Sequence, residues 1–522
     1  MAALKPEERA LVLIGFMGAG KSRALRAVRE AGLEATDADR ALERELGGSI
    51  AEFFDRQGEA EFRRREEALV PRLVERSRGG AIALGGGAVH SEAVRRAIAD
   101  HVVVWLQVGV EDAWDRAARH DRPLARDREA FAALLRAREP LYRTIADAVL
   151  PPGDDVAARA LPHLLALRSM PAGTRLLWGA SSSGEYPAYI GPGLLDRSPL
   201  GVAAGYGDIG LGGRPFGITD TTVASLHGDW LASLAGVIEI PAGEASKTLA
   251  EAGRVLGELT RRGVRRDDHL VALGGGVVGD LAGFCAAVYQ RGLPVVHAPT
   301  TLVAQVDSAY GGKTGVDLPE AKNYVGAYHL PAAVIADTET LRTLPEPELR
   351  AGFVEVVKTA LIAGGELWER VRGVDRLDAK ALAPLIAPCA QVKLEIVAAD
   401  ERDAGRRAAL NLGHTVGHAI EAASGYARYR HGEAVGLGLL AALRLAGTDE
   451  LRGEVGALLA RHGLPTRLDA AVPTDAVLAA VDRDKKRTAA GVGFVLLEGP
   501  GSIATGQLVD EARVRAAVEE LR

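Results

Sequence analysis

The chain has 522 residues, too many for one hydrophobic core, which predicts about three domains. Apolar residues make up 48% and charged residues 25%, without a run long enough to span a bilayer, so we expect a soluble globular protein. The net charge is −6, and neither part of the chain has the basic excess of a nucleic-acid-binding protein.

The N-terminus and the cysteine content predict a cytoplasmic protein. Acidic residues precede the first apolar segment and no small-residue cleavage site follows it, so we expect no signal peptide. Two cysteines, Cys285 and Cys389, cannot form a disulfide framework. We therefore expect a reducing compartment, small-molecule substrates, and neither a membrane nor a nucleic-acid partner.

Lysine is scarce, because only ten of the 63 basic residues are lysines. An ammonium group is a compact charge whose pKa the surroundings can shift, whereas a guanidinium hardly titrates. Lysines that persist in an arginine-rich chain are therefore candidates for function.

The first chemical motif follows a predicted strand, Leu11 to Ile14. The sequence Gly15-x-x-x-x-Gly20-Lys21-Ser22 then leads into a predicted helix from Arg23 to Glu30. In such a loop, backbone N–H groups face nucleotide phosphates, the lysine reaches the terminal phosphates and the serine ligates Mg²⁺. The segment therefore predicts an ATP site.

Further clusters follow this loop. Asp37 and Asp39 are predicted at the end of a strand, on one side of it. Arg63 to Arg65 are predicted at a helix start, where Arg64 and Arg65 fit a solvated face. A strand then runs into Gly85 to Gly87, where a backbone can approach a ligand closely. Two later arginines, in DRPL and REPLYR, are Arg122 and Arg138.

In this order, GFMGAGKS, DAD, GEAEFRRRE, LGGGAV and RPL with REPLYR resemble shikimate kinase. The resemblance implies that ATP and Mg²⁺ bind at Gly18, Ala19, Gly20, Lys21 and Ser22, with Arg122 on a mobile lid. It implies that shikimate binds at Asp39, Arg63, Gly86 and Arg138. Lys21, Asp39 and Arg122 are the implied catalytic residues. Arg23 departs from the family pattern, so the alternative is an inactive kinase-like module.

Residues 169–173 form a short predicted linker after the first domain, 1–168. Alternating strands and helices then predict an α/β domain over residues 174–340. Its strand Leu270 to Leu273 runs into Gly274 to Gly276, with Asp280 opening a helix, which suits a pyrophosphate at a helix N-terminus. Several charged residues between Arg291 and Asn323 predict an anionic substrate.

The last part, residues 341–522, contains two sets of chemical side chains. Glu355 and Lys358 lie three apart in an apolar predicted helix, as either an internal ion pair or a metal ligand beside a catalytic ammonium. His414 and His418 are four apart on a helix, with His431 nearby, so their imidazoles can converge on a catalytic metal. The alternative is that these are ordinary surface or core histidines.

From Pro241 onward, the motifs PAGEASK, GGGVVGD, PTTLVAQVDSAYGGKTGVD, GFVEVVK, LNLGHTVGHAIE and HGEAVG resemble 3-dehydroquinate synthase. The resemblance implies that Zn²⁺ or Co²⁺ is bound by Glu355, His414 and His431, with His418 on the substrate side. Its implied NAD contacts are Asp220, Glu244, Lys247, Gly275, Gly276, Val277, Asp280, Thr300, Thr301, Lys313, Lys322 and Thr343. Its implied contacts to the heptulosonate phosphate are Arg291, Asp307, Lys313, Asn323, Lys358, Lys393, Arg407, Asn411 and His418, with Lys485 or Lys486.

The resemblances imply an α/β protein of several domains. A P-loop kinase, with a parallel sheet and helices on both sides, precedes an NAD-binding α/β domain and a mostly helical metal-binding domain. The resemblance also implies a homodimer through the synthase part. Asp307, Lys313, Lys358 and His418 are the implied catalytic residues of the synthase part. The implied function is bifunctional: phosphorylation of shikimate, and NAD- and metal-dependent formation of 3-dehydroquinate. Asp403 stands where the family has Glu, and the alternative for the second part is another sugar-phosphate cyclase or a polyol dehydrogenase.

Overall fold

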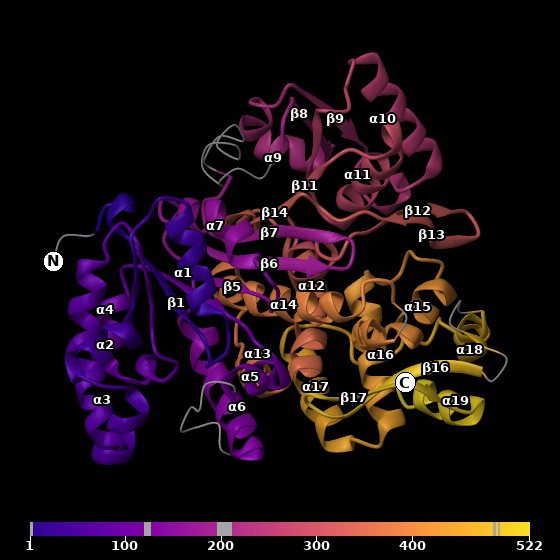
Figure 1. Cartoon of the computed structure of the whole chain (residues 1–522). Helices are drawn as coiled ribbons and strands as arrows, with labels where there is room; N and C mark the ends of the chain where they lie inside the picture. The colour runs from indigo at the N-terminus through magenta and orange to yellow at the C-terminus, as the bar shows by residue number, and fades with distance from the viewer. Residues whose placement is uncertain (1–3, 119–126, 196–210, 404, 484–486, 489–490) are drawn as a thin grey trace. The chain divides into compact units, whose positions relative to one another are not determined.

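The computed structural model describes residues 4–118, 127–195, 211–403, 405–483, 487–488 and 491–522 (Figure 1). They form two compact units: unit 1 is 1–178 with 187–210, and unit 2 is 179–186 with 211–522. The predicted contacts Arg122, Lys485 and Lys486 lie outside the described residues.

Unit 1 contains a parallel sheet in the order β2-β3-β1-β4-β5-β6. The strands are β1 (Leu11–Ile14), β2 (Ala35–Asp37), β3 (Ala81–Ala83), β4 (Val102–Leu106), β5 (Ala148–Leu150) and β6 (Arg175–Ser181), followed by β7 (Gly184–Gly191). Every residue of β1, β3, β4 and β5 is buried, which is typical of a parallel sheet covered on both faces by helices. This confirms the predicted P-loop architecture.

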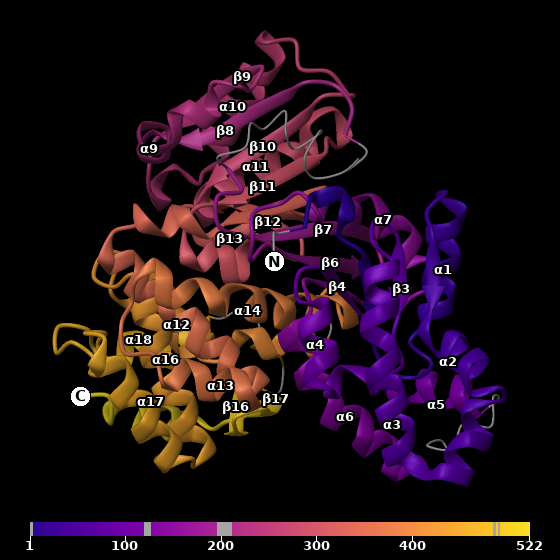
Figure 2. The same ribbon diagram turned by 90° about the vertical axis from the view of Figure 1, so that its left-hand side faces the viewer.

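The helices of unit 1 are labelled in Figures 1 and 2. They are α1 (Lys21–Glu30), α2 (Ala38–Leu46), α3 (Ile50–Arg76), α4 (Glu92–Ile98), α5 (Val110–Ala118), α6 (Arg128–Ile145) and α7 (Val156–Leu167). Gly58 interrupts α3 with a φ of 80°, so Arg63 lies about one turn after the break.

The prediction that Asp37 and Asp39 share a strand is wrong. Strand β2 ends at Asp37, whose side chain accepts a hydrogen bond from the backbone N–H of Arg40 and so caps α2. Asp39 lies in the first turn of that helix. Aspartate is favoured at both positions, because its carboxylate complements the free N–H groups of a helix start.

The α/β part of unit 2 has a second parallel arrangement, β14-β11-β10-β8-β9. Its strands are β8 (Pro215–Asp220), β9 (Gly236–Ile240), β10 (His269–Gly274), β11 (Val295–Pro299) and β14 (Ala333–Asp337). Its helices are α9 (Thr221–Leu231), α10 (Leu249–Arg261) and α11 (Gly276–Val288), which pack a shared apolar core. Helix α11 begins before Asp280, which therefore lies one turn inside it. An antiparallel hairpin, β12 (Lys313–Leu318) and β13 (Ala321–Tyr328), completes this part.

The rest of unit 2 is mostly helical, as predicted. It contains α12 (Glu346–Ala363), α13 (Gly365–Arg372), α14 (Ala379–Ala399), α15 (His414–Ala423), α16 (His431–Ala446), α17 (Asp449–Arg461), α18 (Thr474–Asp482) and α19 (Glu511–Glu519), with β15 (Arg487–Thr488), β16 (Gly491–Gly499) and β17 (Ser502–Leu508).

Two glycines let the backbones of α12, α15 and α16 approach closely. A Cβ on Gly432 would lie 1.9 Å from the backbone oxygen of Ala351 on α12. A Cβ on Gly438 would lie 2.0 Å from the oxygen of Gly413, which caps α15. Since real Cβ contacts are never so short, only glycine permits this packing. It brings the first residues of α15 and α16 against the middle of α12.

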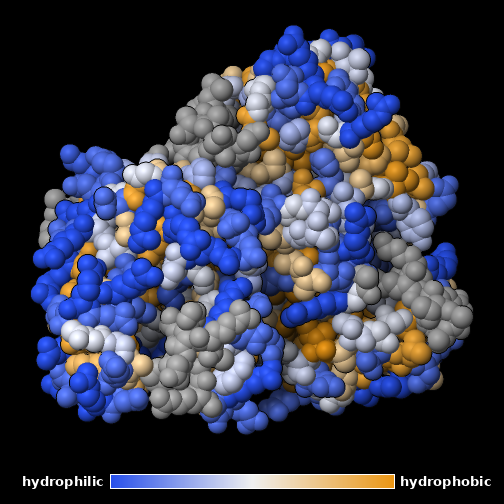
Figure 3. Space-filling model, viewed as in Figure 1, coloured by the Kyte–Doolittle hydropathy of each residue, from blue (hydrophilic) through white to orange (hydrophobic). Residues whose placement is uncertain are grey.

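Both cysteines are free and buried, Cys285 in α11 and Cys389 in α14. Burial raises the pKa of each thiol to about 12. Helix α14 is, among the described residues, the one helix long and apolar enough to cross a bilayer, and most of its apolar stretch is buried inside the protein. The large hydrophobic side chains that are exposed in the described part of the chain all belong to unit 2, and polar residues predominate on the face of unit 1 seen in Figure 3.

Candidate active sites

The predicted phosphate loop is present and preformed. Gly20 caps α1 with a φ of 87°, and the helix begins at Lys21. The ammonium of Lys21 donates hydrogen bonds to the backbone oxygens of Gly15 (2.8 Å) and Phe16 (3.0 Å). A Cβ on Gly15 would lie 2.5 Å from the oxygen of Leu106 at the end of β4. The loop therefore holds its lysine over the place where phosphates bind in such motifs.

The residues predicted to bind shikimate surround the loop that follows β3, Gly85 to Gly87. A Cβ on Gly85 would lie 2.8 Å from Oδ1 of Asp39, and one on Gly87 would lie 2.4 Å from Nη2 of Arg63. A Cβ on Gly86 would lie 3.6 Å from Nη1 of Arg138. The structure thus brings an acid from α2 and arginines from α3 and α6 to one glycine loop.

Arg138 is 6% exposed, and its Nε has no hydrogen-bond partner. A buried guanidinium donor left unpaired costs free energy until an anion binds to it. The hydroxyl of Tyr142, one turn later in α6, donates to the backbone oxygen of Gly86. The site therefore suits a small carboxylate.

Glu66, which is not among the residues implied by the resemblance, also belongs to this site. It is 4% exposed, and its carboxylate lies 2.6 Å from Nη1 of Arg63. Burial raises the pKa of Glu66, and Arg63 opposes that shift. The signal in the sequence was the three-residue spacing from Arg63, which places the two groups on one helix face.

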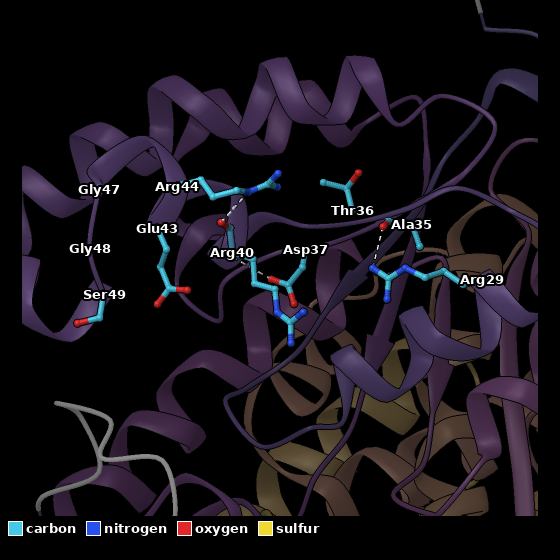
Figure 4. Close-up of a pocket in the computed structure, with 10 residues that line it drawn as sticks. All are labelled: Arg29, Ala35, Thr36, Asp37, Arg40, Glu43, Arg44, Gly47, Gly48 and Ser49. Carbon is cyan, nitrogen blue, oxygen red and sulfur yellow. Dashed lines mark hydrogen bonds between the residues drawn. The ribbon is translucent and has the colours of Figure 1, made fainter.

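A broad recess of about 900 Å³ lies beside this site (Figure 4). Its lining comes from the end of α1, β2, α2 and the turn after α2. It includes Asp37 but none of Asp39, Arg63 and Arg138. Within it, Arg29 donates to the backbone oxygen of Ala35 at 2.8 Å. Since it lacks the converging groups at Gly85 to Gly87, we assign the chemistry to the glycine loop.

In unit 2, residues predicted to bind NAD lie at the carboxyl edge of the parallel strands. Asp220 ends β8 and accepts hydrogen bonds from the N–H groups of Thr222 and Val223. Gly275 follows β10 and caps α11 without a side-chain hydrogen bond, so the first amides of α11 remain available. Thr301 follows β11, and its Cγ2 lies 2.8 Å from a Cβ built on Gly275. This edge binds nucleotides in parallel α/β folds, and the free amides suit a pyrophosphate.

Lys247 is buried beside this edge, 4% exposed, and contacts several polar side chains. Its ammonium donates to Oδ1 of Asn323 (2.7 Å) and to Asp280 (3.2 Å), and lies 3.3 Å from Glu244. Burial raises the pKa of Asp280 to about 6, although Lys247 opposes the shift. Asp317, which is not among the residues implied by the resemblance, accepts the N–H of Asn323 and so holds that residue in its left-handed conformation.

Three of the predicted metal ligands converge between α12, α15 and α16. Oε1 of Glu355 lies 3.8 Å from Nε2 of His414 and 3.5 Å from Nε2 of His431. Glu355 is 1% exposed, and neither of its oxygens accepts a well-aligned hydrogen bond. A buried carboxylate in this state suits a cation ligand.

The histidine tautomers also fit a metal. Nδ1 of His414 lies 3.1 Å from the backbone oxygen of Leu412, which can only accept, so this nitrogen carries the proton and Nε2 keeps its lone pair. In the same way, Nδ1 of His431 faces Oε2 of Glu421 at 3.2 Å. His418 lies close by, because its ring centroid is 5.1 Å from that of His414, and its ligand nitrogen lies within 4.8 Å of those of His414 and His431. The convergence predicted from the histidine spacing is present.

Lys358 stands beside this centre, 1% exposed. Its ammonium lies 2.5 Å from Glu355 and donates to Asp307 at 2.8 Å. The ammonium of Lys393 contacts the other oxygen of Asp307. Burial lowers the pKa of Lys393, while the two carboxylates outweigh burial and raise that of Lys358. Two lysines and one aspartate thus form a charged group next to the metal centre.

The remaining predicted substrate residues differ in placement. Lys313 pairs with Asp403 at 2.5 Å, and Nδ2 of Asn411 donates to the oxygen of Ala408. Arg407 is 1% exposed and donates to the backbone oxygens of Gly311 and Glu401. Arg291 precedes β11, at the edge opposite to Gly275 and Thr301.

Glu401 anchors the turn that carries Arg407. Its carboxylate accepts hydrogen bonds from the hydroxyls of Ser182 and Ser183 and from the N–H of Ser183. Burial alone would raise the pKa of Glu401, but these bonds lower it to about 2. The hairpin between β6 and β7 therefore holds this turn through a carboxylate that remains charged.

Three family models match the chain: shikimate kinase over residues 17–166, 3-dehydroquinate synthase N-terminal over 237–351 and 3-dehydroquinate synthase C-terminal over 352–487. A 3-dehydroquinate synthase from Symbiobacterium thermophilum is 43% identical over 357 residues, covering 65% of this chain and 98% of that protein.

Two solved structures resemble the same region. A 2-epi-5-epi-valiolone synthase from Streptomyces hygroscopicus subsp. jinggangensis 5008, with NAD⁺ and Zn²⁺ bound, is 28% identical with a TM-score of 0.59, covering 64% of this chain and 96% of that one. A 2-deoxy-scyllo-inosose synthase complexed with carbaglucose-6-phosphate, NAD⁺ and Co²⁺ is 25% identical with a TM-score of 0.58, covering 66% and 99%.

Proposed function

Since this chain belongs to the 3-dehydroquinate synthase family and carries a shikimate kinase domain before the synthase region, we propose that two separate active sites serve its two reactions. The chain is a bifunctional enzyme of the shikimate pathway. It phosphorylates shikimate with ATP, and it converts 3-deoxy-D-arabino-heptulosonate 7-phosphate into 3-dehydroquinate with release of phosphate. Identity to the synthase, 43%, exceeds the 28% and 25% identities to the two other cyclases.

The proposed domains are the kinase at 1–168, a linker at 169–173, the NAD-binding domain at 174–340 and the metal- and substrate-binding domain at 341–522. The family matches support this division. The kinase match ends at residue 166, and the match to the N-terminal synthase domain ends at residue 351, where the match to the C-terminal synthase domain follows. Helix α7 ends at Leu167 and β6 begins at Arg175, on either side of the proposed linker.

In the kinase, Gly18 to Ser22 bind ATP through their backbone amides, and Lys21 neutralises charge on its terminal phosphates. Mg²⁺, held through Ser22, adds positive charge there. Asp39 accepts the proton of the reacting shikimate hydroxyl, while Arg63 and Arg138 pair with the shikimate carboxylate beside Gly86. Arg122 steadies the phosphoryl group from the lid. The arrangement of these groups around Gly85 to Gly87 supports this assignment.

In the synthase, Glu355, His414 and His431 hold Zn²⁺ or Co²⁺, the metals named for the two similar cyclases. A metal held by these three residues would supply a Lewis acid for the substrate's hydroxyl and ketone oxygens. The position of Oε1 of Glu355 near Nε2 of both His414 and His431, and the Nδ1 contacts of the two histidines, support this ligand set over one that includes His418. His418 then faces the substrate.

The first amides of α11, those of Gly276 and Val277, would hold the pyrophosphate of NAD at the carboxyl edge of the parallel strands. When bound there, NAD would supply a reversible hydride acceptor, so the reaction would have no net redox change. Lys247 fixes Glu244 and Asp280 in place. The other contacts are Asp220, Gly275, Thr300, Thr301, Lys313, Lys322 and Thr343.

Lys358 and Lys393 hold the substrate's anionic groups beside the metal. Both lysines share Asp307, which keeps two ammonium groups together in a buried place. Their charge attracts the carboxylate and phosphate of the keto acid, and a fixed orientation makes the later ring closure an intramolecular step. Lys313, Asn323, Arg407, Asn411 and His418 complete the proposed contacts, whereas the position of Arg291 before β11 does not support the substrate contact expected for it. Asp307, Lys313, Lys358 and His418 are the proposed catalytic residues.

The convergence of Glu355, His414 and His431 beside Lys358 is the observation that carries the synthase proposal. Its test follows phosphate release from the heptulosonate phosphate with NAD⁺ and Zn²⁺, and ADP formation from ATP with shikimate, on the full chain. We expect Glu355→Ala to abolish only phosphate release and Lys21→Ala to abolish only ADP formation. Loss of both activities in either variant would contradict separate sites, and a wild-type chain without phosphate release would contradict the synthase assignment.

The protein acts on small molecules, in the cytoplasm, without binding nucleic acid or a membrane, and it dimerises through the synthase region. The net charge of −6 supports the expectation that the protein binds neither nucleic acid nor a membrane, because nucleic acids and anionic lipids repel such a surface. Light scattering during size-exclusion chromatography tests the dimer, and a mass of one chain, about 55 kDa, would contradict it.

A further inference from the structure

Glu421 lies between two parts of the synthase site, and the proposed function gives this residue no role. It lies on α15, seven residues after His414, and is 4% exposed. Its Oε2 faces Nδ1 of His431 at 3.2 Å, and its Oε1 lies 3.7 Å from the ammonium of Lys322. A buried carboxylate with one oxygen on each of two site residues is costly unless both contacts form.

The contact to His431 decides which nitrogen of that ring is available. The carboxylate of Glu421 can accept the Nδ1 proton, which leaves Nε2, the nitrogen 3.5 Å from Glu355, for a metal. The contact also fixes the rotation of the ring about its bond to Cβ. His414 is oriented instead by a backbone oxygen, that of Leu412. His431 is thus the ligand whose orientation depends on a side chain.

The contact to Lys322 connects Glu421 with the proposed NAD site. Lys322 lies on β13, and its ammonium is 3.7 Å from Glu244 as well as from Glu421. It also lies 4.5 Å from the centroid of the Tyr426 ring, which follows α15. Glu244 and Lys322 are proposed NAD contacts. The carboxylate of Glu421 therefore contacts one residue of the metal site, His431, and one residue of the NAD site, Lys322.

We propose that Glu421 is a positioning residue that orients His431 toward the metal and, through its other oxygen, holds Lys322 at the NAD site. The inference rests on the proposed function, because it assumes a metal at Glu355, His414 and His431. It adds that both sites share one support, so a change at Glu421 weakens the binding of metal and of NAD together. Carboxylates behind a ligating histidine typically contribute 10–100-fold to metal affinity.

The test compares Glu421→Gln and Glu421→Ala with the control Glu433→Gln on the full chain. Glu433 lies two residues after His431, and its carboxylate accepts the N–H of Arg430 at the start of α16, so its variant reports damage to that helix alone. Affinity for Zn²⁺ is measured by chelator competition without NAD or substrate, and the Co²⁺ protein is examined by its visible absorption. NAD affinity is measured by calorimetry.

We expect Glu421→Ala to weaken Zn²⁺ binding about 10–100-fold, to change the Co²⁺ spectrum and to weaken NAD binding. Glu421→Gln should lose less metal affinity, because its amide oxygen still accepts the Nδ1 proton. Lys322→Met should weaken NAD binding and leave Zn²⁺ affinity as in the wild type, and Glu433→Gln should leave both unchanged.

Wild-type metal affinity and an unchanged Co²⁺ spectrum in Glu421→Ala would overturn the inference while leaving the synthase function intact. If Glu421→Ala does not fold, the isosteric Glu421→Gln decides the same question, since unchanged metal and NAD affinities in it would also overturn the inference. Equal losses in Glu433→Gln would trace the effect to helix stability and overturn it as well. A wild-type protein that binds no metal and releases no phosphate would overturn the proposed function itself.

Discussion

Glu355 and Lys358 lie one turn apart on α12, with their charged groups 2.5 Å from each other and both side chains about 1% exposed. Neither group can be hydrated where it lies, so Lys358 compensates the charge of Glu355, while Glu355 and Asp307 together compensate that of Lys358. Removing one partner of such a pair leaves an uncompensated buried charge, which typically costs about 3–5 kcal/mol.

We therefore expect Lys358→Met to abolish phosphate release and to lower the melting temperature of the metal-free protein, with a smaller decrease when Zn²⁺ is bound, because the cation then compensates Glu355. Thermal denaturation with and without Zn²⁺ measures both effects. Arg350→Met is the control, because Arg350 forms an exposed pair with Glu346 on the same helix and should cost about 0–1 kcal/mol. An equal decrease with and without metal would contradict compensation by the metal.

Gly432→Ala should disrupt the metal centre. The added methyl group would lie 1.9 Å from the oxygen of Ala351, so α16 must move away from α12, and His431 precedes the substituted residue. We expect loss of Zn²⁺ affinity and a lower melting temperature. Gly436→Ala on the same helix meets atoms no closer than 3.5 Å and should be neutral or stabilising by about 0.5–1 kcal/mol. Similar metal affinities in the two variants would refute this role of the helix crossing.

Glu66→Gln should impair shikimate binding in the kinase. Glu66 pairs with Arg63 at 2.6 Å and fixes the guanidinium beside Gly87. Without that charge, Arg63 is held less firmly, so KM for shikimate should rise about tenfold or more while KM for ATP stays within twofold, consistent with one charged hydrogen bond. Steady-state ADP formation measures both constants. Glu61→Gln, which affects the pairs with Arg64 and Arg65, is expected to change neither constant.

Stability should depend on Glu401 in acid. Because its pKa is lowered from 4.5 to about 2, its contribution is complete above pH about 4.5 and is lost as pH falls from there toward 2. Glu401→Gln should cost about 2 kcal/mol at pH 7. The difference in melting temperature between variant and wild type should shrink between pH 5 and pH 3. A difference that stays constant over this range would show that the charge of Glu401 is not what holds the turn.

Local pattern predicted much of this molecule. The strand before the phosphate loop, the glycine loops at Gly85 and Gly275 and the histidine-bearing helix follow from periodicity and from residue types with special backbone freedom. Asp39 was misplaced because a period of two was extended past a helix cap. Glu66 and Glu421 were not singled out as functional, since their roles depend on which side chains face them after folding, and the contact of Glu421 with Lys322 spans 99 residues. The distance from Glu355 to His431 depends on the crossing of two helices at Gly432.

The labelling rates of the two buried cysteines can report separately on the opening of two parts of unit 2. Cys285 lies in the core of the α/β part of unit 2 and Cys389 in the helical part, and thiols with a pKa near 12 react only when their surroundings open. The rate at which a thiol reagent labels each one in native buffer therefore reports the opening of that part alone. If NAD slows labelling mainly at Cys285 and Zn²⁺ mainly at Cys389, each ligand stabilises only the part of unit 2 that contains that cysteine. If either ligand slows labelling of both cysteines, the α/β part and the helical part open cooperatively.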